Sequence, residues 1–164
     1  MVAVVCLALG CSTARLVAQT TGNATLTISL SDVLQLTVNT NAVNLNFTTA
    51  ASYINGVSST VNNQLTVVSN RGYDISVRAA TANLTNGVNN IPVGNVVVQP
   101  VSLVGGTARV VSALTTTNQA LATGLPATMS SSVNINYSTA AGNTAFLQPA
   151  GAYTTTLTFT VVAL

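Results

Sequence analysis

ATLTISLSDVLQLTV, residues 24–38, carries the clearest structural pattern in the chain. Its even positions are apolar except Asp32, and its odd positions are polar except Val33. Because successive side chains point to opposite faces of a β-strand, this alternation predicts strand with one apolar face. A single strand over this stretch would be about 50 Å long, well beyond the usual length of about five or six residues. We therefore expect two strands in series with a break near Asp32, the second at residues 33–39.

The same alternation recurs along the chain and predicts a domain built from strands. It is clearest at residues 43–48, 73–78 and 133–138, and further strands are expected at residues 64–69, 96–104, 108–114 and 153–164. Asn-Gly and Gly-Gly pairs between them tolerate the positive φ of tight turns. One helical turn, at residues 118–123, is the most that the pattern allows. Eight or nine short strands in a chain of this length predict an all-β fold, an immunoglobulin-like two-sheet sandwich.

Charged side chains are nearly missing from the 164 residues, at 4% of the chain, against about 25% in an average soluble protein. There is no histidine, lysine or glutamate, and Asp32 and Asp74 are the only acids. Acid–base, triad and metal chemistry therefore lack the groups that they require. We expect no catalytic, cofactor-binding or metal-binding residues, no cofactor and no enzyme activity. Four scattered arginines are too few to follow a nucleic acid backbone.

Small polar side chains take the place of the missing charges. The chain holds 26 Thr, 14 Ser and 18 Asn, about a third of its residues. Threonine favours strands because its branched Cβ suits a pleated surface. A surface of hydroxyls and amides also lacks long-range repulsion, so identical molecules can approach one another closely. This composition favours a protein that packs against copies of itself.

The first 18 residues are typical of a secretory signal peptide. The apolar run Met1–Gly10 is too short to span a membrane, and small and polar residues follow it. Cleavage is expected between Ala18 and Gln19; the alternative is cleavage before Cys11 with lipid attachment. Both cysteines lie in this leader, so the mature chain forms no disulfide. We expect a secreted protein, extracellular or at the cell surface, without a membrane span.

The two ends of the mature chain carry the predicted site residues. Residues 19–31 are expected to form a donor strand that leaves its own domain, residues 32–164. Its polymerisation residues are Ala24, Leu26, Ile28 and Leu30. The last alternating segment supplies the expected acceptor groove, with Tyr153, Leu157, Phe159 and Val161 on its apolar face. A spare strand at one end and a strand running to the other end meet the requirement for strand exchange.

Asp32 interrupts the apolar phase and allows two interpretations. Its carboxylate caps backbone amides at a turn, or it marks the hinge between the exchanged strand and the domain. Tyr53 falls in a predicted loop and is free to bind a ligand, whereas Tyr73, Tyr137 and Tyr153 share the phase of the core residues.

Three segments carry a resemblance to a known class of proteins. They are TVVSNRGYDISVRAATANLTNG (66–87), NNIPVGNVVV (89–98) and YTTTLTFTVVAL (153–164). In texture and strand layout they resemble bacterial secreted pilin-like β-sandwiches, such as chaperone–usher pilins and spore-coat-U-type subunits. The resemblance implies an immunoglobulin-like fold that lacks one strand and is completed by the N-terminal strand of a neighbour. The disulfide of many such pilins is missing from this chain.

These observations favour a structural subunit of an extracellular filament or pilus that assembles by donor-strand complementation. The expected partners are copies of the same chain, with a periplasmic chaperone or an outer-membrane assembly protein assisting. The alternative is a monomeric surface adhesin, a sandwich module that binds a carbohydrate or a protein. Its ligand site would lie on loops such as residues 50–60 or 140–152.

Overall fold

Strands dominate the part of the chain that the computed structural model describes, residues 20–164. The prediction of an all-β fold is confirmed. The chain separates into one unit that ends at Leu30 and a second unit, Ser31–Leu164, that contains every strand found in residues 20–164. The predicted leader, residues 1–18, lies outside the described residues together with Cys6 and Cys11.

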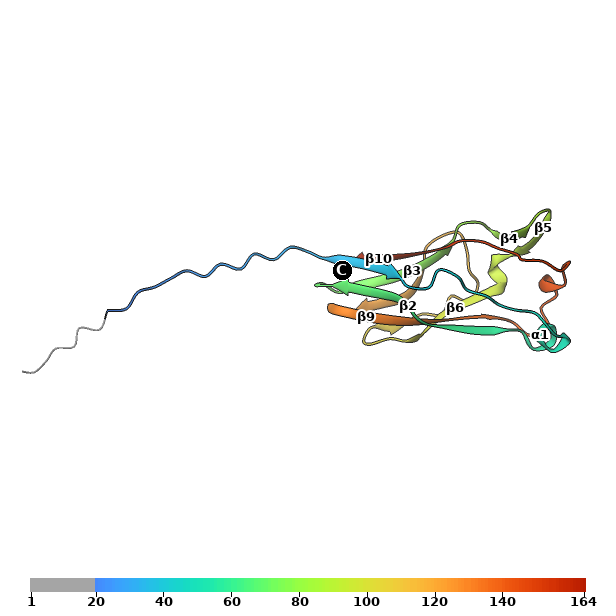
Figure 1. Ribbon diagram of the computed structural model, residues 1–164, viewed down its shortest axis with the longest axis horizontal. Helices are drawn as coiled ribbons and strands as arrows, with labels where there is room; N and C mark the ends of the chain where they lie inside the picture. Colours follow the sequence, from blue (N-terminus) through green and yellow to red (C-terminus); the bar gives the residue numbers. More distant parts are fainter. Residues whose placement is uncertain (1–19) are drawn as a thin grey trace, which may run out of the picture. The chain divides into compact units, whose positions relative to one another are not determined.

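The second unit holds two antiparallel sheets of four strands and one separate hairpin (Figure 1). The first sheet has the order β1 (Leu34–Val38), β2 (Ser58–Ser69), β9 (Thr128–Thr139), β6 (Val96–Ser102). The second has the order β10 (Leu157–Ala163), β3 (Tyr73–Ala79), β8 (Gln119–Leu125), β7 (Thr107–Ala108). The hairpin pairs β4 (Asn83–Asn86) with β5 (Asn89–Pro92). Short helical segments are α1 (Ala50–Asn55), η1 (Val93–Asn95) and η2 (Thr144–Phe146).

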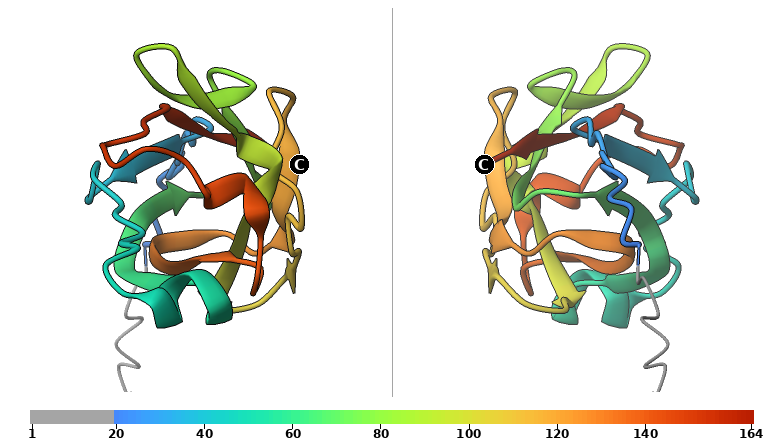
Figure 2. Two further views of the ribbon diagram at one scale, coloured as in Figure 1. Left: turned by 90° about the vertical axis from the view of Figure 1, so that its right-hand side faces the viewer. Right: turned by 90° about the vertical axis from the view of Figure 1, so that its left-hand side faces the viewer.

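One apolar core lies between the two sheets, which form separate layers when seen along the strands (Figure 2). Alternate residues of β3, among them Ile75 and Val77, are buried, and their neighbours in sequence face outward. In β9, Val133, Ile135 and Tyr137 alternate in the same way. The alternation predicted at residues 73–78 and 133–138 is therefore confirmed, with its apolar phase directed into the core.

The side of the molecule formed by β6 and β7 is closed by a segment that passes from one sheet to the other. Thr107 and Ala108 pair with β8 of the second sheet, and Val111 then bridges to Val98 of the first. The prediction of one continuous strand at residues 108–114 is wrong, because the chain changes partner sheets within that stretch. The crossing covers the edge of β6 at Val96 and Val98 through backbone hydrogen bonds from Val111 and Leu114.

Two local predictions are corrected by the structure. Residues 119–123 belong to strand β8, and residues 118–123 form no helical turn, since pairing with β3 overrides the weak helical preference of alanine-rich sequence. A helix forms instead at α1, where the Thr49 side chain accepts a hydrogen bond from the backbone N–H of Ser52. The helix ends at Gly56, whose φ of 75° and close approach to Thr139 exclude a side chain.

Candidate functional site

On the side of the molecule opposite the β6–β7 edge, the outer strands of the two sheets, β1 and β10, approach each other without a ladder between them. Each of these strands lies at the edge of its sheet and pairs on one side only, β1 with β2 and β10 with β3. We call this feature the seam. Its first wall holds Leu34, Leu36, Val38, Val43, Leu45 and Phe47, and its second wall holds Tyr153, Leu157, Phe159 and Val161. None of these residues is fully buried, although most of them pack against the core.

Residues 43–48 have the alternation of a strand without a strand partner. Val43, Leu45 and Phe47 are half-buried, and the residues between them are exposed. Within the described part of the chain, no ladder joins residues 40–48 to another strand. The strand predicted here is therefore not formed, and its backbone N–H and C=O groups are not used in a sheet. The sequence pattern fits a strand whose neighbour is missing.

A cavity of about 520 Å³ lies between residues 43–48 and residues 151–157. Its floor is the core itself, with side chains from the first sheet, from the hairpin and from the segments next to them: Leu84, Ile91, Val93, Val96, Leu114 and Tyr137. This volume is several times the 150 Å³, roughly, that deletion of one large core side chain leaves. The cavity can therefore take several apolar side chains of an incoming segment.

One polar pair lies beneath the seam. The Tyr137 hydroxyl donates a 2.7 Å hydrogen bond to Gln64 Oε1, and both side chains are buried. Gln64 reaches the core because a bulge after Val61 shifts the register of β2 against β9, with Asn63 at a φ of 51°. Burial raises the pKa of the Tyr137 phenol far above its ordinary value, so the hydroxyl stays neutral.

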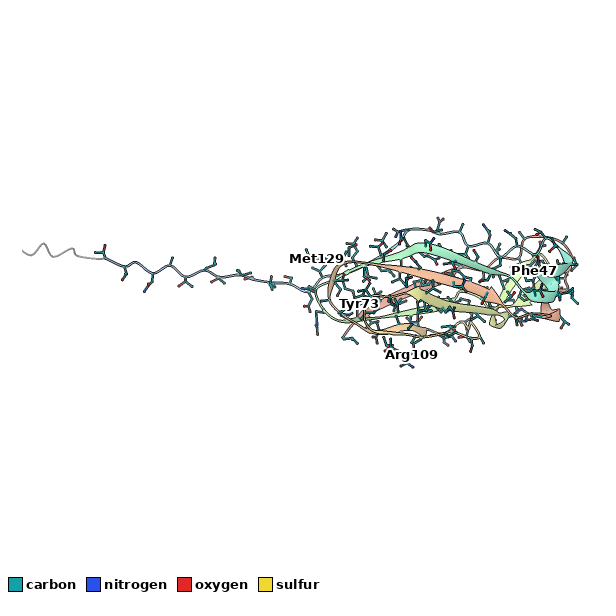
Figure 3. All side chains as sticks on the ribbon, turned by 90° about the horizontal axis from the view of Figure 1, so that it is seen from below. Phe47, Tyr73, Arg109 and Met129 are labelled. Atoms are coloured by element: carbon teal, nitrogen blue, oxygen red, sulfur yellow. The ribbon has the colours of Figure 1, made fainter. Side chains whose placement is uncertain are left out.

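Three aromatic rings stand at one end of the seam. Phe47 stacks on Phe146 at 4.7 Å between ring centroids and lies tilted against Tyr53 at 5.1 Å. Tyr53 lies in α1 and its ring packs against Phe47. The prediction of a free loop tyrosine is therefore wrong. We call this the mouth end, and Figure 3 shows Phe47 there, far from Met129 and Tyr73.

At the other end, which we call the root end, residues 31–33 are held by the turn between β2 and β3. The Asn70 side chain accepts a hydrogen bond from the Val33 N–H at 2.9 Å and donates one to the Ser31 carbonyl at 2.8 Å. Arg71 contacts Asp32 Oδ2 at 3.0 Å and the Leu164 backbone oxygen at 2.6 Å. Arg71 thus connects the beginning of β1 to the end of β10.

Asp32 makes an exposed ion pair with Arg71, so its carboxylate does not cap backbone amides as one interpretation expected. Asp32 is the second residue of the unit Ser31–Leu164, next to the boundary at Leu30, and its role as a hinge stays a prediction. Nothing in the alternation of the sequence indicates the contact of Arg71 with Asp32. Asp74, the other acid, accepts a hydrogen bond from the Gly124 N–H of β8 at 2.7 Å.

The predicted polymerisation residues lie in a segment with neither helix nor strand. We call residues 20–30 the arm; every residue in it is exposed, including Ala24. The exposed fractions of the three large side chains are 85% for Leu26, 74% for Ile28 and 87% for Leu30. Apolar side chains with this exposure are a binding surface or an aggregation hazard.

The predicted acceptor residues all lie on the second wall of the seam, in two groups. Tyr153 and Leu157 line the cavity, whereas Phe159 and Val161 continue along β10 toward the root end, beyond the cavity. The Tyr153 hydroxyl donates to the Pro149 carbonyl at 2.9 Å. The first wall was not predicted as part of the site; its signal, the alternation at residues 43–48, was interpreted as an ordinary strand.

Other classes of site find little support in residues 20–164. No group of three or more His, Cys, Asp or Glu side chains is placed to hold a metal ion within that range. The same residues contain no helix with the length and apolar character needed to cross a membrane. Neither a protein-family model nor a curated protein sequence matches this chain.

Proposed function

We propose that the protein is a structural subunit of an extracellular filament, assembled when the arm of one copy enters the seam of the next. In this proposal the fold is an immunoglobulin-like sandwich that lacks one strand, and the neighbour supplies it. One observation carries the proposal: the same chain has an exposed arm with alternating apolar residues and an unfilled seam with alternating apolar walls. Each feature is what the other needs to complete a core.

The energetics favour insertion. Burial of Ala24, Leu26, Ile28 and Leu30 contributes roughly 4 to 10 kcal/mol as an upper estimate. Both walls also offer unused backbone groups, and each hydrogen bond to them adds about 1 kcal/mol before the cost of ordering the arm. A junction of this kind dissociates slowly. It also covers two strand edges that otherwise invite unspecific pairing.

The geometry of the seam sets the direction of the inserted strand. Residues 34–48 run from the root end to the mouth end, and β10 runs back from the mouth end to the root end. The arm is attached to its own subunit at the root end, through Ser31. An arm that enters the next subunit at the mouth end therefore runs parallel to residues 43–48 and antiparallel to β10. This arrangement adds copies head to tail.

The proposal includes export and a transient partner. The seam of a newly exported subunit is apolar and open, so a periplasmic chaperone or an outer-membrane assembly protein is the expected temporary occupant. The leader pattern at residues 1–18 of the sequence supports the secretion that this proposal includes.

The decisive experiment moves the arm within the chain. Residues 20–30 are removed from the N-terminus and placed after Leu164 through a short Gly/Ser linker, from which they can fold back antiparallel to β10. The protein beginning at Gln19 is expected to form filaments in electron microscopy. The rearranged protein is expected to be monomeric in size-exclusion chromatography and to melt at a higher temperature than the domain without an arm.

A matched control carries Leu26→Ser, Ile28→Ser and Leu30→Ser in the relocated arm. It is expected to lose the gain in melting temperature, because its strand brings no apolar face to the seam. Equal melting temperatures for the rearranged protein and this control would contradict the proposal. A stable, monomeric protein beginning at Gln19 would contradict it as well.

The alternative function, a monomeric binding module, is favoured by one specific observation. The cavity lies within the range of small-molecule sites, about 300–1,000 Å³, and Phe47 and Phe146 stack beside it. This function predicts a monomer whose seam takes an apolar or aromatic ligand. A monomer that binds such a ligand, with weaker binding in a Phe146→Ala variant, would support it over the filament.

A further inference from the structure

A second apolar hollow lies at the root end, outside the seam. Its volume is about 420 Å³, and it is lined by Val33 of the segment before β1, Val68 and its neighbours in β2, and the β8–β9 turn up to Met129. Met129 is 93% exposed, the largest exposed fraction among the large apolar side chains of residues 20–164. An exposed methionine beside a hollow is typical of an unfilled contact surface.

The mouth end carries exposed apolar side chains of its own. Ile54 of α1 is 66% exposed, and Leu147, next to η2, is 67% exposed. Their neighbours Tyr53 and Phe146 both contact Phe47, which fixes α1 and η2 at this end. Figure 3 shows Met129 and Phe47 at opposite ends of the strand-built unit. The molecule thus has an apolar hollow at one end and apolar projections at the other.

The length of the chain between arm and domain brings these two ends together. Val33 is bound to Asn70 through its backbone N–H and its carbonyl, and Ser31 is bound to the Asn70 side chain. Leu30 is therefore the last residue of the arm that is free of these contacts, and a chain of this length from Leu30 to Val33 spans about 10 Å at most. If Leu30 of one copy fills the mouth end of the next, the root end of the first copy must touch that mouth end.

We infer that successive copies of this chain form a second contact, in which the mouth end of one copy, with Leu147 and Ile54, covers the root-end hollow of the other. This inference rests on the proposed function and deepens it, because it assigns a filament interface separate from the seam. The contact is head to tail, so it repeats along the filament. This contact restrains the angle between neighbouring copies. An inserted arm that is joined to its own domain only through residues 31 and 32 does not restrain that angle.

The test measures filament stiffness by electron microscopy. Met129→Arg leaves the arm and the seam intact and is expected to give filaments with a persistence length at least two-fold shorter. Combining Met129→Arg with Leu147→Asp is expected to recover stiffness, because the two new charges face each other across the contact. Val110→Asp is the matched control: Val110 is exposed, follows Arg109 between the two ends, and is expected to leave stiffness unchanged.

The outcomes separate this inference from the proposed function. Met129→Arg filaments as stiff as those of the unaltered protein overturn the inference and leave the filament function standing. A loss of stiffness in Val110→Asp equal to that in Met129→Arg also overturns it. Failure of the unaltered protein to form any filament overturns the proposed function first. Because Met129 and Leu147 are exposed, circular dichroism is expected to show folded protein for every variant.

Discussion

Tyr137 is the residue where the core and the seam meet. Its ring lines the cavity, and its hydroxyl is held by Gln64 at the bulge of β2. A buried hydroxyl without a partner costs about 1–3 kcal/mol, which explains why the chain turns a glutamine into an apolar core.

Alkaline pH is expected to destabilise the folded protein through Tyr137. An unfolded tyrosine loses its proton near pH 10, whereas burial raises the pKa of Tyr137 in the folded state. Above about pH 10 the folded state therefore holds more protons, and the free energy of unfolding falls by up to about 1.4 kcal/mol per pH unit. Urea denaturation between pH 8 and pH 12, roughly, measures this slope. A Tyr137→Phe variant with an equally steep slope would contradict the assignment.

Asn70 is expected to matter more than Asp32 for the stability of the root end. Asn70→Ala removes two side-chain hydrogen bonds to the backbone of residues 31–33 and is expected to lower the free energy of unfolding by about 1–2 kcal/mol. Asp32→Asn removes only an exposed ion pair, worth less than about 1 kcal/mol. Chemical denaturation of the two variants compares them directly, and a larger loss for Asp32→Asn would reverse the ranking.

At the level of elements, alternation predicted some of the paired strands but missed β8 and the hairpin of β4 and β5. It succeeded in β3 and β9 because one face of each is fully buried, so the apolar phase is strict. It failed at residues 108–114, where the partner changes from one sheet to the other. It also failed to separate residues 43–48 from an ordinary strand, because a sequence records the faces of a segment and not the presence of a neighbour. Contacts such as that of Arg71 with Asp32 join residues far apart in sequence, and no local pattern reveals them.

Amide hydrogen exchange in the seam is expected to slow when a peptide with the arm's sequence binds. In the domain without an arm, amides of residues 43–48 lack ladder hydrogen bonds and are expected to exchange quickly. Addition of a synthetic peptide of residues 20–30 is expected to slow exchange at residues 43–48 and along β10. Amides in the middle of β9, already paired on both sides, serve as the internal control. Protection limited to residues outside the seam would place the peptide elsewhere.

The whole molecule is defined by its lack of charge. Four arginines and two aspartates leave a formal net charge of +2, and one arginine is already paired with one aspartate. Long-range electrostatic steering and repulsion therefore contribute little when copies meet. In the proposed filament, association would depend instead on apolar fit and on backbone hydrogen bonds.

Assembly is accordingly expected to be insensitive to ionic strength. Between about 50 mM and 500 mM NaCl, where screening of surface charges changes strongly, the rate of filament growth measured by light scattering is expected to vary less than about two-fold. An Arg71→Ala variant controls for the one ion pair at the root end. A rate that changes ten-fold with salt would show that charge governs the encounter.

The separation of root end and mouth end has a consequence for a polymer of this protein. A linear array has two chemically unlike tips: the last molecule at one tip shows an unoccupied cleft, and the last at the other shows a bare strand. Growth is then directional, and a single ligand that binds the growing tip stops the addition of further molecules. A short peptide with the arm's sequence is such a ligand for the tip whose cleft is unoccupied.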